Sequence, residues 1–296
     1  MRNVLLLHNP AAGGAPTPDL LQMVRRELAF ADCRVETRAS ERAGEITAFC
    51  RDASRNGVDR IVVCGGDGTV REAAKGLRGG RVPLALIPLG TSNILGWELG
   101  LPVGNPRACA AVAAAGTLRE IGLGVVDEAE VFTFCASAGP DSLAVEGVDL
   151  NLKSEKGGVA YCRSALVGML ERGLPRLSAR TGEGERFEGA QILTLRARRY
   201  GTGSIKVSRS ADLEASTLRL MVLSRSAVLG LPRLLPAALR GGLEDSPGVT
   251  WRDTRSVRIE GTESWPVQAD GDLVGNTPAT IRCADESLPV VVPIRG

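Results

Sequence analysis

The stretch IVVCGGDGTVRE at residues 61–72 decides how the chain folds. Its first four residues are apolar and mostly β-branched, which indicates a buried strand, and the residues after Gly68 have the pattern of a helix. Between these two segments, Gly65, Gly66 and Gly68 surround Asp67. Glycine lets the backbone turn sharply and lets a bulky anion approach the main chain, and N–H groups at the start of a helix attract negative charge. The stretch therefore predicts a phosphate-binding strand-loop-helix unit, with an ordinary glycine-rich turn as the alternative.

Short apolar runs alternate with helical segments through the first 125 residues of the chain. Strands are expected at Val4–Leu7, Cys33–Thr37, Ile61–Cys64 and Leu84–Ile87. Helices are expected at Pro18–Ala29, Glu41–Arg55, Thr69–Leu77 and Ser92–Leu99. Such alternation is typical of a parallel sheet, which binds its ligands at the carboxyl ends of its strands.

Two further loops of small residues follow strands of this expected sheet. Residues 9–14, Asn-Pro-Ala-Ala-Gly-Gly, follow the first strand, and residues 88–93, Pro-Leu-Gly-Thr-Ser-Asn, follow the fourth. The stretch at 61–72 matches neither GxxxxGK[ST] nor GxGxxG, so the prediction does not rest on either of those motifs. Three small-residue loops at one edge of one sheet predict a cleft for a triphosphate.

After about residue 125 the sequence changes to strands without regular helices between them. Strands are expected at Val131–Ala136, Ala190–Arg196, Ser204–Val207, Leu218–Leu223, Val257–Glu260 and Pro289–Ile294. Two helical pieces are expected at Gly158–Arg172 and Leu229–Arg240. The predicted fold is α/β, with a parallel-sheet nucleotide-binding domain followed by a mostly antiparallel β-sandwich or barrel. We expect the first domain at residues 1–125 and the second at 126–284.

Composition excludes several kinds of function. A net charge of +2 and an aromatic content of 3% do not favour nucleic-acid binding. The seven cysteines are scattered and His8 is the only histidine, so no zinc site is predicted and histidine-based catalysis is not expected. No apolar run is long enough to span a membrane, and Val4–Leu7 is too short for a signal peptide, so a cytoplasmic location is expected.

Charge is concentrated in one segment. Residues 151–200 carry ten basic and five acidic residues, and include an apolar helical run at 165–170. This combination would suit peripheral contact with the anionic inner face of a membrane, although an ordinary solvated surface has the same composition.

Together the motifs resemble the diacylglycerol kinase catalytic family of lipid kinases, which includes sphingosine kinases and bacterial lipid kinases. The matching stretches, in the family's order, are residues 9–13, 65–69 with Glu72, 88–93 with 99–102, 138–141 and 269–272. The resemblance implies ATP as the phosphate donor, Mg²⁺, a lipid hydroxyl as acceptor and a two-domain fold. It also implies that the tail at about 285–296 completes the first domain. A homodimer would be in keeping with it.

The family's site residues can be carried over by position. The resemblance places nucleotide contacts on Asn9, Pro10, Ala11, Ala12, Gly13, Ser40, Gly65, Gly66, Asp67, Gly68, Thr69, Glu72 and Thr91. It places substrate contacts on Asn93 and Asp141, and the catalytic pair on Asp270, as general base, and Asp272, where a glutamate is usual. From the residues alone, Asp270-Gly271-Asp272 is also typical of a hairpin turn.

Several positions depart from the family's pattern. Gly14 stands where a basic residue is common, and Lys75 where an asparagine is common. Bacterial members hold a structural Mg²⁺ in a loop that matches residues 210–218, but Ala215 stands where an aspartate belongs, so no metal site is predicted there; rescue of the site by Asp212 and Glu214 is the alternative. Diacylglycerol or a related lipid is the expected acceptor. Two alternatives remain open: an NAD kinase, which shares the Gly-Gly-Asp-Gly-Thr loop, and a nucleotide- or lipid-binding protein that has lost catalysis.

Overall fold

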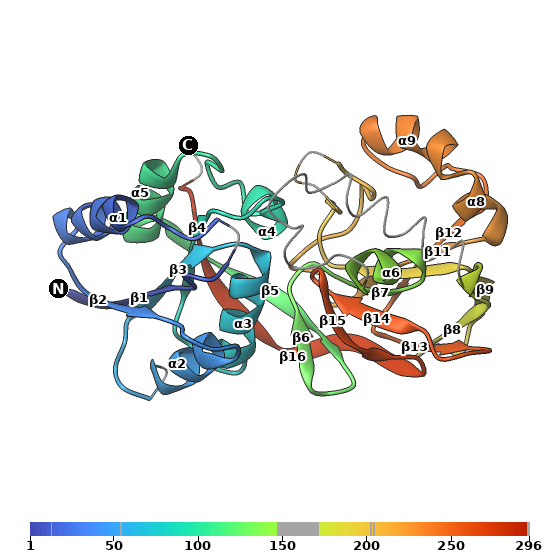
Figure 1. Ribbon diagram of the computed structural model, residues 1–296, viewed down its shortest axis with the longest axis horizontal. Helices are drawn as coiled ribbons and strands as arrows, with labels where there is room; N and C mark the ends of the chain where they lie inside the picture. Colours follow the sequence, from blue (N-terminus) through green and yellow to red (C-terminus); the bar gives the residue numbers. More distant parts are fainter. Residues whose placement is uncertain (13, 54, 147–171, 202, 204, 295–296) are drawn as a thin grey trace. The chain divides into compact units, whose positions relative to one another are not determined.

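The computed structural model describes residues 1–12, 14–53, 55–146, 172–201, 203 and 205–294 (Figure 1). The chain forms two compact units. Unit 1 comprises Met1–Ile121 and Glu286–Gly296, and unit 2 comprises Gly122–Asp285.

Unit 1 is built around a parallel sheet. Its strands, in spatial order, are β2 (Cys33–Ala39), β1 (Arg2–His8), β3 (Arg60–Gly65), β4 (Leu84–Pro88) and the end of β16 (Ala279–Val292). All of these neighbours pair in parallel. All residues of β3 and β4 are buried, as expected for strands with helices on both faces.

Two pairs of helices cover the two faces of this sheet (Figure 1). The helices of unit 1 are α1 (Pro18–Phe30), α2 (Glu45–Ala53), α3 (Asp67–Leu77), α4 (Ile94–Glu98) and α5 (Pro106–Ala115). Helix α1 packs beside α5, and α2 packs beside α3. The second pair is very close, because a Cβ at Gly76 would lie 2.3 Å from the carbonyl oxygen of Thr47. This packing fixes α3 against the sheet.

Unit 2 contains a six-stranded antiparallel sheet. Its strands, in spatial order, are β12 (Val249–Thr254), β11 (Leu218–Leu223), β10 (Gln191–Leu195), β7 (Cys135–Ala138), β14 (Pro266–Ala269) and β15 (Asp272–Asn276). The remaining strands are β5 (Thr117–Val126), β6 (Glu130–Phe132), β8 (Leu177–Thr181), β9 (Arg186–Gly189), β13 (Ser256–Gly261) and the start of β16. The helices among its described residues are α6 (Pro140–Glu146), α8 (Arg225–Leu229) and α9 (Leu231–Leu239).

The core of unit 2 contains two large aromatic side chains among Ala, Val, Leu and Ile. Phe132 and Trp265 are both buried there. A Cβ at Gly124 would lie 1.9 Å from the Phe132 ring, so the ring rests directly on the backbone of β5. The close approach of the β5 backbone to the Phe132 ring thus helps to fill a core that contains few aromatic residues.

The predicted fold class is confirmed: a parallel α/β sheet occupies the N-terminal unit and antiparallel strands dominate the second. All four strands predicted for the first unit are present, and each extends by one or two residues at its ends. Helix α2 begins at Glu45 instead of Glu41, because the Glu45 carboxylate accepts the backbone N–H groups of Glu41 and Arg42 and holds them in a turn.

Three predictions for the second unit were wrong in detail. The strand predicted at Val131–Ala136 is interrupted, since the N–H groups of Thr133 and Phe134 bond to a side chain rather than to a neighbouring strand. In the strand predicted at Ser204–Val207, the described residues 205–207 show strand pairing only as a bridge between Lys206 and Arg199. The helix predicted at Leu229–Arg240 is two helices, α8 and α9, that meet at Gly230.

The helix predicted at Gly158–Arg172 lies outside the described residues, except for its last residue. The apolar run at 165–170 lies outside them as well. Within the described ranges, no helix is both long enough and apolar enough to cross a bilayer.

Candidate functional site

Two of the predicted phosphate loops touch through their backbones at the carboxyl edge of the unit 1 sheet. The N–H of Leu89 donates to the carbonyl oxygen of Gly65, with 2.9 Å between N and O. A Cβ at Gly90 would lie 2.6 Å from the Cα of Gly66, and a Cβ at Gly66 would lie 3.1 Å from the Cα of Gly90. A side chain at position 90 would push the two loops apart, and one at position 66 would crowd them, so the loops after β3 and β4 form one continuous surface.

The loop after β1 joins the same surface. The Asn9 side chain folds the loop by accepting the N–H of Ala11 at 2.9 Å. Gly14 has a φ of +93°, and a Cβ there would lie 2.1 Å from the carbonyl oxygen of Leu89. The absence of a basic side chain at Gly14 therefore has a structural reason, because this backbone leaves no room for one. Pro10 and Ala11 are exposed, and Gly13 lies outside the described residues.

The N-terminus of α3 opens onto this surface without a side-chain cap. Gly66 is the N-cap residue and has no side chain to offer. The Thr69 side chain is buried against Gly65, where a Cβ would lie 2.8 Å from the Thr69 hydroxyl oxygen. Gly66 and Gly68 are only partly buried. Uncapped N–H groups at the positive end of a helix dipole bind anions, so the geometry fits a phosphate group.

The carboxylate of Asp67 ties this loop to the next helix. Its oxygens accept the N–H of Ile94 at 3.2 Å and the N–H of Leu95 at 3.5 Å, at the start of α4. Asp67 therefore orients the loop by holding it against the start of α4. Contact with a metal ion bound to phosphate stays a prediction.

Asn93 folds the loop after β4. It is buried with a φ of +48°. Its side-chain oxygen accepts the N–H of Gly90 at 2.8 Å, and its side-chain nitrogen donates to the Gly90 carbonyl oxygen at 2.6 Å. Its amide is thus engaged within the loop, and the predicted substrate contact stays a prediction. Thr91, at the tip of this loop, is exposed.

Ser40 and Glu72 lie farther along the same edge. Ser40 is buried, and its N–H donates to the carbonyl oxygen of His8 at 2.9 Å. The Glu72 carboxylate accepts the N–H of Gly44 at 3.1 Å, which joins α3 to the segment that follows Ser40. Burial lowers the pKa of His8 below its usual 6.5, so this imidazole is neutral at pH 7.

In unit 2, Asp270 and Gly271 form the two-residue loop of the hairpin that joins β14 to β15. Their φ values are +50° and +88°, and Ala269 pairs with Asp272 across the turn. Two consecutive residues with positive φ are typical of the type I′ turn that Asp-Gly favours. The turn expected from this pair is therefore present, and its existence is compatible with a catalytic role for either carboxylate.

The Asp270 carboxylate accepts four hydrogen bonds. One oxygen accepts the N–H of Thr133 at 2.6 Å and its hydroxyl at 2.8 Å, and the other accepts the N–H groups of Phe134 and Cys135 at 3.0 Å each. Burial raises the pKa of Asp270 to about 6, against the opposing effect of these bonds. All four usual acceptor positions of the carboxylate are occupied. The role of Asp270 as general base stays a prediction, whereas the four hydrogen bonds show that its carboxylate anchors the turn. Asp272, on β15, is half-buried.

Asp141 is the centre of a second polar cluster in unit 2. Its carboxylate accepts the hydroxyl groups of Ser137 and Tyr200, and the side-chain N–H of Gln191 at 2.7 Å. Burial, and then the Asp141 charge, raise the pKa of Tyr200 well above its usual value. The predicted lipid contact of Asp141 is not tested by this network.

A glutamine connects the two acidic sites of unit 2. Gln268 donates to the Ser137 hydroxyl at 2.7 Å and accepts the N–H of Gly271 at 2.9 Å. Sequence reasoning missed Thr133, Ser137 and Gln268, although polar residues within strands that are otherwise buried would have been a signal.

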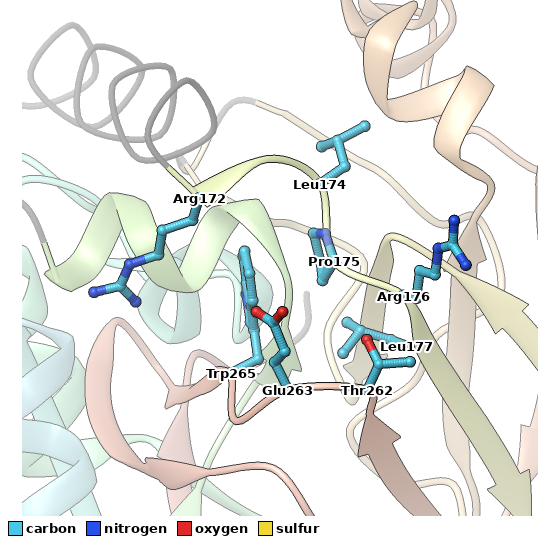
Figure 2. A pocket seen from close by; sticks show the side chains of 8 residues that line it. All are labelled: Arg172, Leu174, Pro175, Arg176, Leu177, Thr262, Glu263 and Trp265. Atoms are coloured by element: carbon cyan, nitrogen blue, oxygen red, sulfur yellow. The ribbon is translucent and has the colours of Figure 1, made fainter.

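Among the cavities lined by described residues, two lie in unit 2. Figure 2 shows the smaller one, about 160 Å³, which lies between residues 172–177 and 262–265. The buried indole N–H of Trp265 has no acceptor among the described residues. The larger cavity, about 740 Å³, is lined by charged side chains of both signs together with Leu177 and small polar residues; the charged ones are Arg176, Arg186, Arg225, Glu188 and Glu260.

The residues of this chain fit a nucleotide with its Mg²⁺ better than they fit a separate structural metal. Magnesium is usually held by substrate phosphates and one or two carboxylates, and Asp67 supplies a carboxylate at the loop edge. The segment 210–218 does not fit the structural ion that the family resemblance implies, because Ala215 has no ligating side chain and the carbonyl oxygens of Leu213 and Ala215 already accept hydrogen bonds from Arg196. Across the described ranges, no three His, Cys, Asp or Glu side chains gather in a metal-binding group.

Comparison with known proteins agrees with this geometry. Residues 3–126 match the diacylglycerol kinase catalytic domain, and residues 135–292 match the YegS C-terminal NAD kinase beta sandwich-like domain. The chain is 26% identical to a diacylglycerol kinase of Bacillus subtilis over 296 residues, which cover 99% of this chain and 97% of the relative. It is 29% identical to a diacylglycerol kinase of Mycobacterium tuberculosis H37Rv over 250 residues, 82% of this chain and 80% of the relative. It is 25% identical to the probable lipid kinase YegS of Salmonella choleraesuis over 268 residues, 89% and 83% of the two chains.

Solved structures share the fold. A crystal structure from Bacillus anthracis str. Sterne superposes with a TM-score of 0.84 at 23% identity and covers 98% of this chain and 95% of the other. A second, titled as a diacylglycerol kinase from the same organism, has a TM-score of 0.77 at 20% identity and covers 98% and 97%. The two domain matches occupy consecutive parts of the chain, in the order that the sequence motifs indicate. The protein therefore belongs to the diacylglycerol kinase catalytic family, a family of lipid kinases, and carries the C-terminal domain of the YegS type.

Proposed function

We propose that the protein is an ATP-dependent lipid kinase that transfers the γ-phosphate to a hydroxyl group of diacylglycerol or a related lipid. The observation that carries the proposal is the backbone contact of three loops, through Gly14, Gly66, Leu89 and Gly90, beside the uncapped start of α3. Kinases and ATPases bind the phosphates of a nucleotide with backbone N–H groups presented in this way.

In this proposal the unit 1 residues hold the nucleotide and do no bond-making chemistry. The N–H groups at the start of α3 receive the phosphates, and the carboxylate of Asp67 holds the loops after β3 and β4 in register. Mg²⁺, bound with ATP beside Asp67, would neutralise charge on the transferring phosphoryl group. Phosphoryl transfer depends mainly on such positioning and charge stabilisation, so a histidine is not required.

The turn at residues 270–272 supplies the group that accepts the lipid hydroxyl proton. Sequence reasoning assigned this role to Asp270. Its four acceptor positions are all occupied by donors of unit 2, so it could take a proton only by losing one of these bonds. We therefore propose that Asp270 fixes the turn, and that the half-buried carboxylate of Asp272 receives the proton.

Access to a lipid requires contact with a membrane, and we propose that residues 225–240, called here the α8–α9 surface, make it. Leu229, Leu231 and Leu239 are 76%, 46% and 65% exposed. The segment carries three arginines and no acidic residue. Exposed apolar side chains among arginines suit a leaflet that contains anionic lipids, because the leucines enter the headgroup region while the arginines meet negative charge.

The test is a transfer assay with γ-labelled ATP and Mg²⁺. Diacylglycerol, monoacylglycerol, ceramide and sphingosine are offered in mixed micelles, and NAD is offered in parallel. We expect labelled lipid product, with diacylglycerol as the best acceptor, and no product from NAD. Product from NAD alone would refute the lipid assignment and favour the NAD kinase alternative. Tight ATP binding with no product from any acceptor, and no difference between wild type and Asp272→Asn, would identify a protein that has lost catalysis.

A further inference from the structure

Arg196 is a fully buried cation in unit 2. It follows β10 directly, and its side chain is 1% exposed. One terminal nitrogen of its guanidinium donates to the carbonyl oxygens of Leu213 and Ala215, at 2.9 and 2.7 Å. The other terminal nitrogen donates to the thiol sulfur of Cys283 at 3.3 Å. Both oxygen acceptors belong to the loop at 210–218, which leads into β11.

The charge of this guanidinium is balanced mainly by dipoles. Among the described residues, no carboxylate forms a salt bridge with Arg196. Two groups favour its protonated form: the Cys283 sulfur, which accepts its hydrogen bond, and the carboxylate of Asp212, which is exposed. Burial lowers the pKa of Arg196 from its usual value, but an arginine remains protonated in proteins. A buried cation held by converging carbonyl oxygens is an arrangement that proteins otherwise use for metal ions.

The loop is shaped around the guanidinium. The carbonyl oxygen of Leu213 also accepts the N–H of Gly122 at 2.8 Å, so it receives donors from two sides. A Cβ at Gly122 would lie 2.2 Å from the Arg196 terminal nitrogen, so glycine leaves the space that the guanidinium fills. The Asp212 side chain accepts the N–H of Glu214 at 3.0 Å, which turns the loop so that both carbonyl groups point at Arg196.

The same residue is tied to the segment that holds Asp270. The backbone N–H of Arg196 donates to the carbonyl oxygen of Phe134 at 2.8 Å, and the N–H of Phe134 donates to Asp270 at 3.0 Å. Removal of the Arg196 guanidinium would therefore disturb the loop at 210–218 directly, and the turn that contains Asp270 through Phe134.

We infer that the Arg196 guanidinium takes the place of a bound divalent cation at the loop 210–218, so that unit 2 folds without a structural metal there. The cation is then part of the Arg196 side chain. An aspartate at position 215 would have no metal ion to bind, which accounts for the alanine found there. The inference concerns folding and holds whatever the protein phosphorylates.

The experiment measures thermal unfolding of the full chain without nucleotide, in excess EDTA and in millimolar MgCl₂ or CaCl₂. The expected wild-type midpoint is the same in all three buffers, and metal analysis of the purified protein finds no tightly bound divalent ion. Arg196→Met keeps the apolar stem but leaves the carbonyl groups of Leu213 and Ala215 without the buried donor. We expect its midpoint to fall by roughly 10 °C. Arg258→Met, which removes an exposed arginine, is the control and should shift the midpoint little.

A double variant tests the substitution of one cation for another. The double variant Arg196→Met, Ala215→Asp has no guanidinium and has a carboxylate that could bind a metal ion in its place. Its unfolding midpoint should therefore rise with Mg²⁺ or Ca²⁺ and fall with EDTA. A wild-type midpoint that falls in EDTA and recovers with Mg²⁺ would overturn the inference, as would an Arg196→Met protein as stable as wild type. If Arg196→Met does not fold, the wild-type chelation and metal analyses still decide the question, because a bound structural ion in the wild type contradicts it.

Discussion

The contact between Gly66 and Gly90 allows a direct test of the phosphate loops. In Gly90→Ala, the new Cβ would lie 2.6 Å from the Cα of Gly66, whereas ordinary contact begins at 3.4 Å, so the two loops must separate by about 0.8 Å. Both atoms belong to rigid backbone rather than to a flexible side chain. A misplacement of about 1 Å costs roughly 100-fold in rate, or about 2.7 kcal/mol of transition-state stabilisation. We expect kcat/KM for ATP to fall by about this factor.

The assay measures initial rates against ATP concentration at saturating lipid, together with the thermal shift that Mg-ATP produces. Gly66→Ala is a graded comparison, because its Cβ would lie 3.1 Å from the Cα of Gly90 and needs a displacement of only about 0.3 Å. Gly275→Ala, whose Cβ meets nothing within 4 Å, is the control for the substitution itself. Near wild-type kcat/KM in a folded Gly90→Ala protein would refute the argument that these loops grip the nucleotide.

Three further predictions concern unit 2. Burial raises the pKa of Asp270 from 3.8 to about 6, so the folded state binds the carboxyl proton more tightly than the unfolded state does. The free energy of unfolding of the wild type, relative to that of Asp270→Asn, should therefore rise by about 3 kcal/mol as the pH falls from above 6 to below 3.8. Urea unfolding at stepped pH measures this difference, and a difference that does not rise would contradict the prediction. Asp272→Asn should lower kcat by about 100-fold or more with KM for ATP unchanged, while Asp272→Glu should remain active; equal kcat in wild type and Asp272→Asn would exclude it as the base. The double variant Leu229→Ser, Leu239→Ser should bind phosphatidylglycerol vesicles about tenfold more weakly in a sedimentation assay, whereas Leu118→Ser should bind as the wild type does. Equal binding by the double variant and Leu118→Ser would show that the α8–α9 surface does not contact the membrane.

Much of unit 1 follows from local sequence patterns. The apolar run before Gly65 and the helical pattern after Gly68 predict β3 and α3, and the same alternation predicts the other parallel strands. The prediction that loops 9–14, 65–69 and 88–93 meet is a consequence of parallel topology, which brings the carboxyl ends of strands to one edge. What sequence did not reveal is how they meet. Backbone contact between Gly66 and Gly90 depends on strand spacing that no local pattern encodes.

Unit 2 was less predictable because its polar residues serve distant partners. The N–H groups of Thr133 and Phe134 bond to Asp270, more than a hundred residues away in the sequence, and this bond interrupts a run that reads as one strand. Arg196 ends an apolar run and would normally be placed at the surface. Its burial depends on the carbonyl groups of Leu213 and Ala215, whose orientation is a property of the folded loop. Contacts between segments remote in sequence are what periodicity cannot supply.

Strand β16 gives the chain an order of assembly. Val290 pairs with Leu84, so the fifth strand of the unit 1 sheet is synthesised only after the residues of unit 2. Until then β4 has an open edge, and a nascent chain with such an edge can pair with the wrong partner. The first part of β16 pairs with β13, so the same late segment also completes a sheet of unit 2. Neither unit can complete its hydrogen bonding before residues 279–292 have been synthesised, and we expect a chain truncated before residue 279 to need chaperones rather than to fold as a stable half.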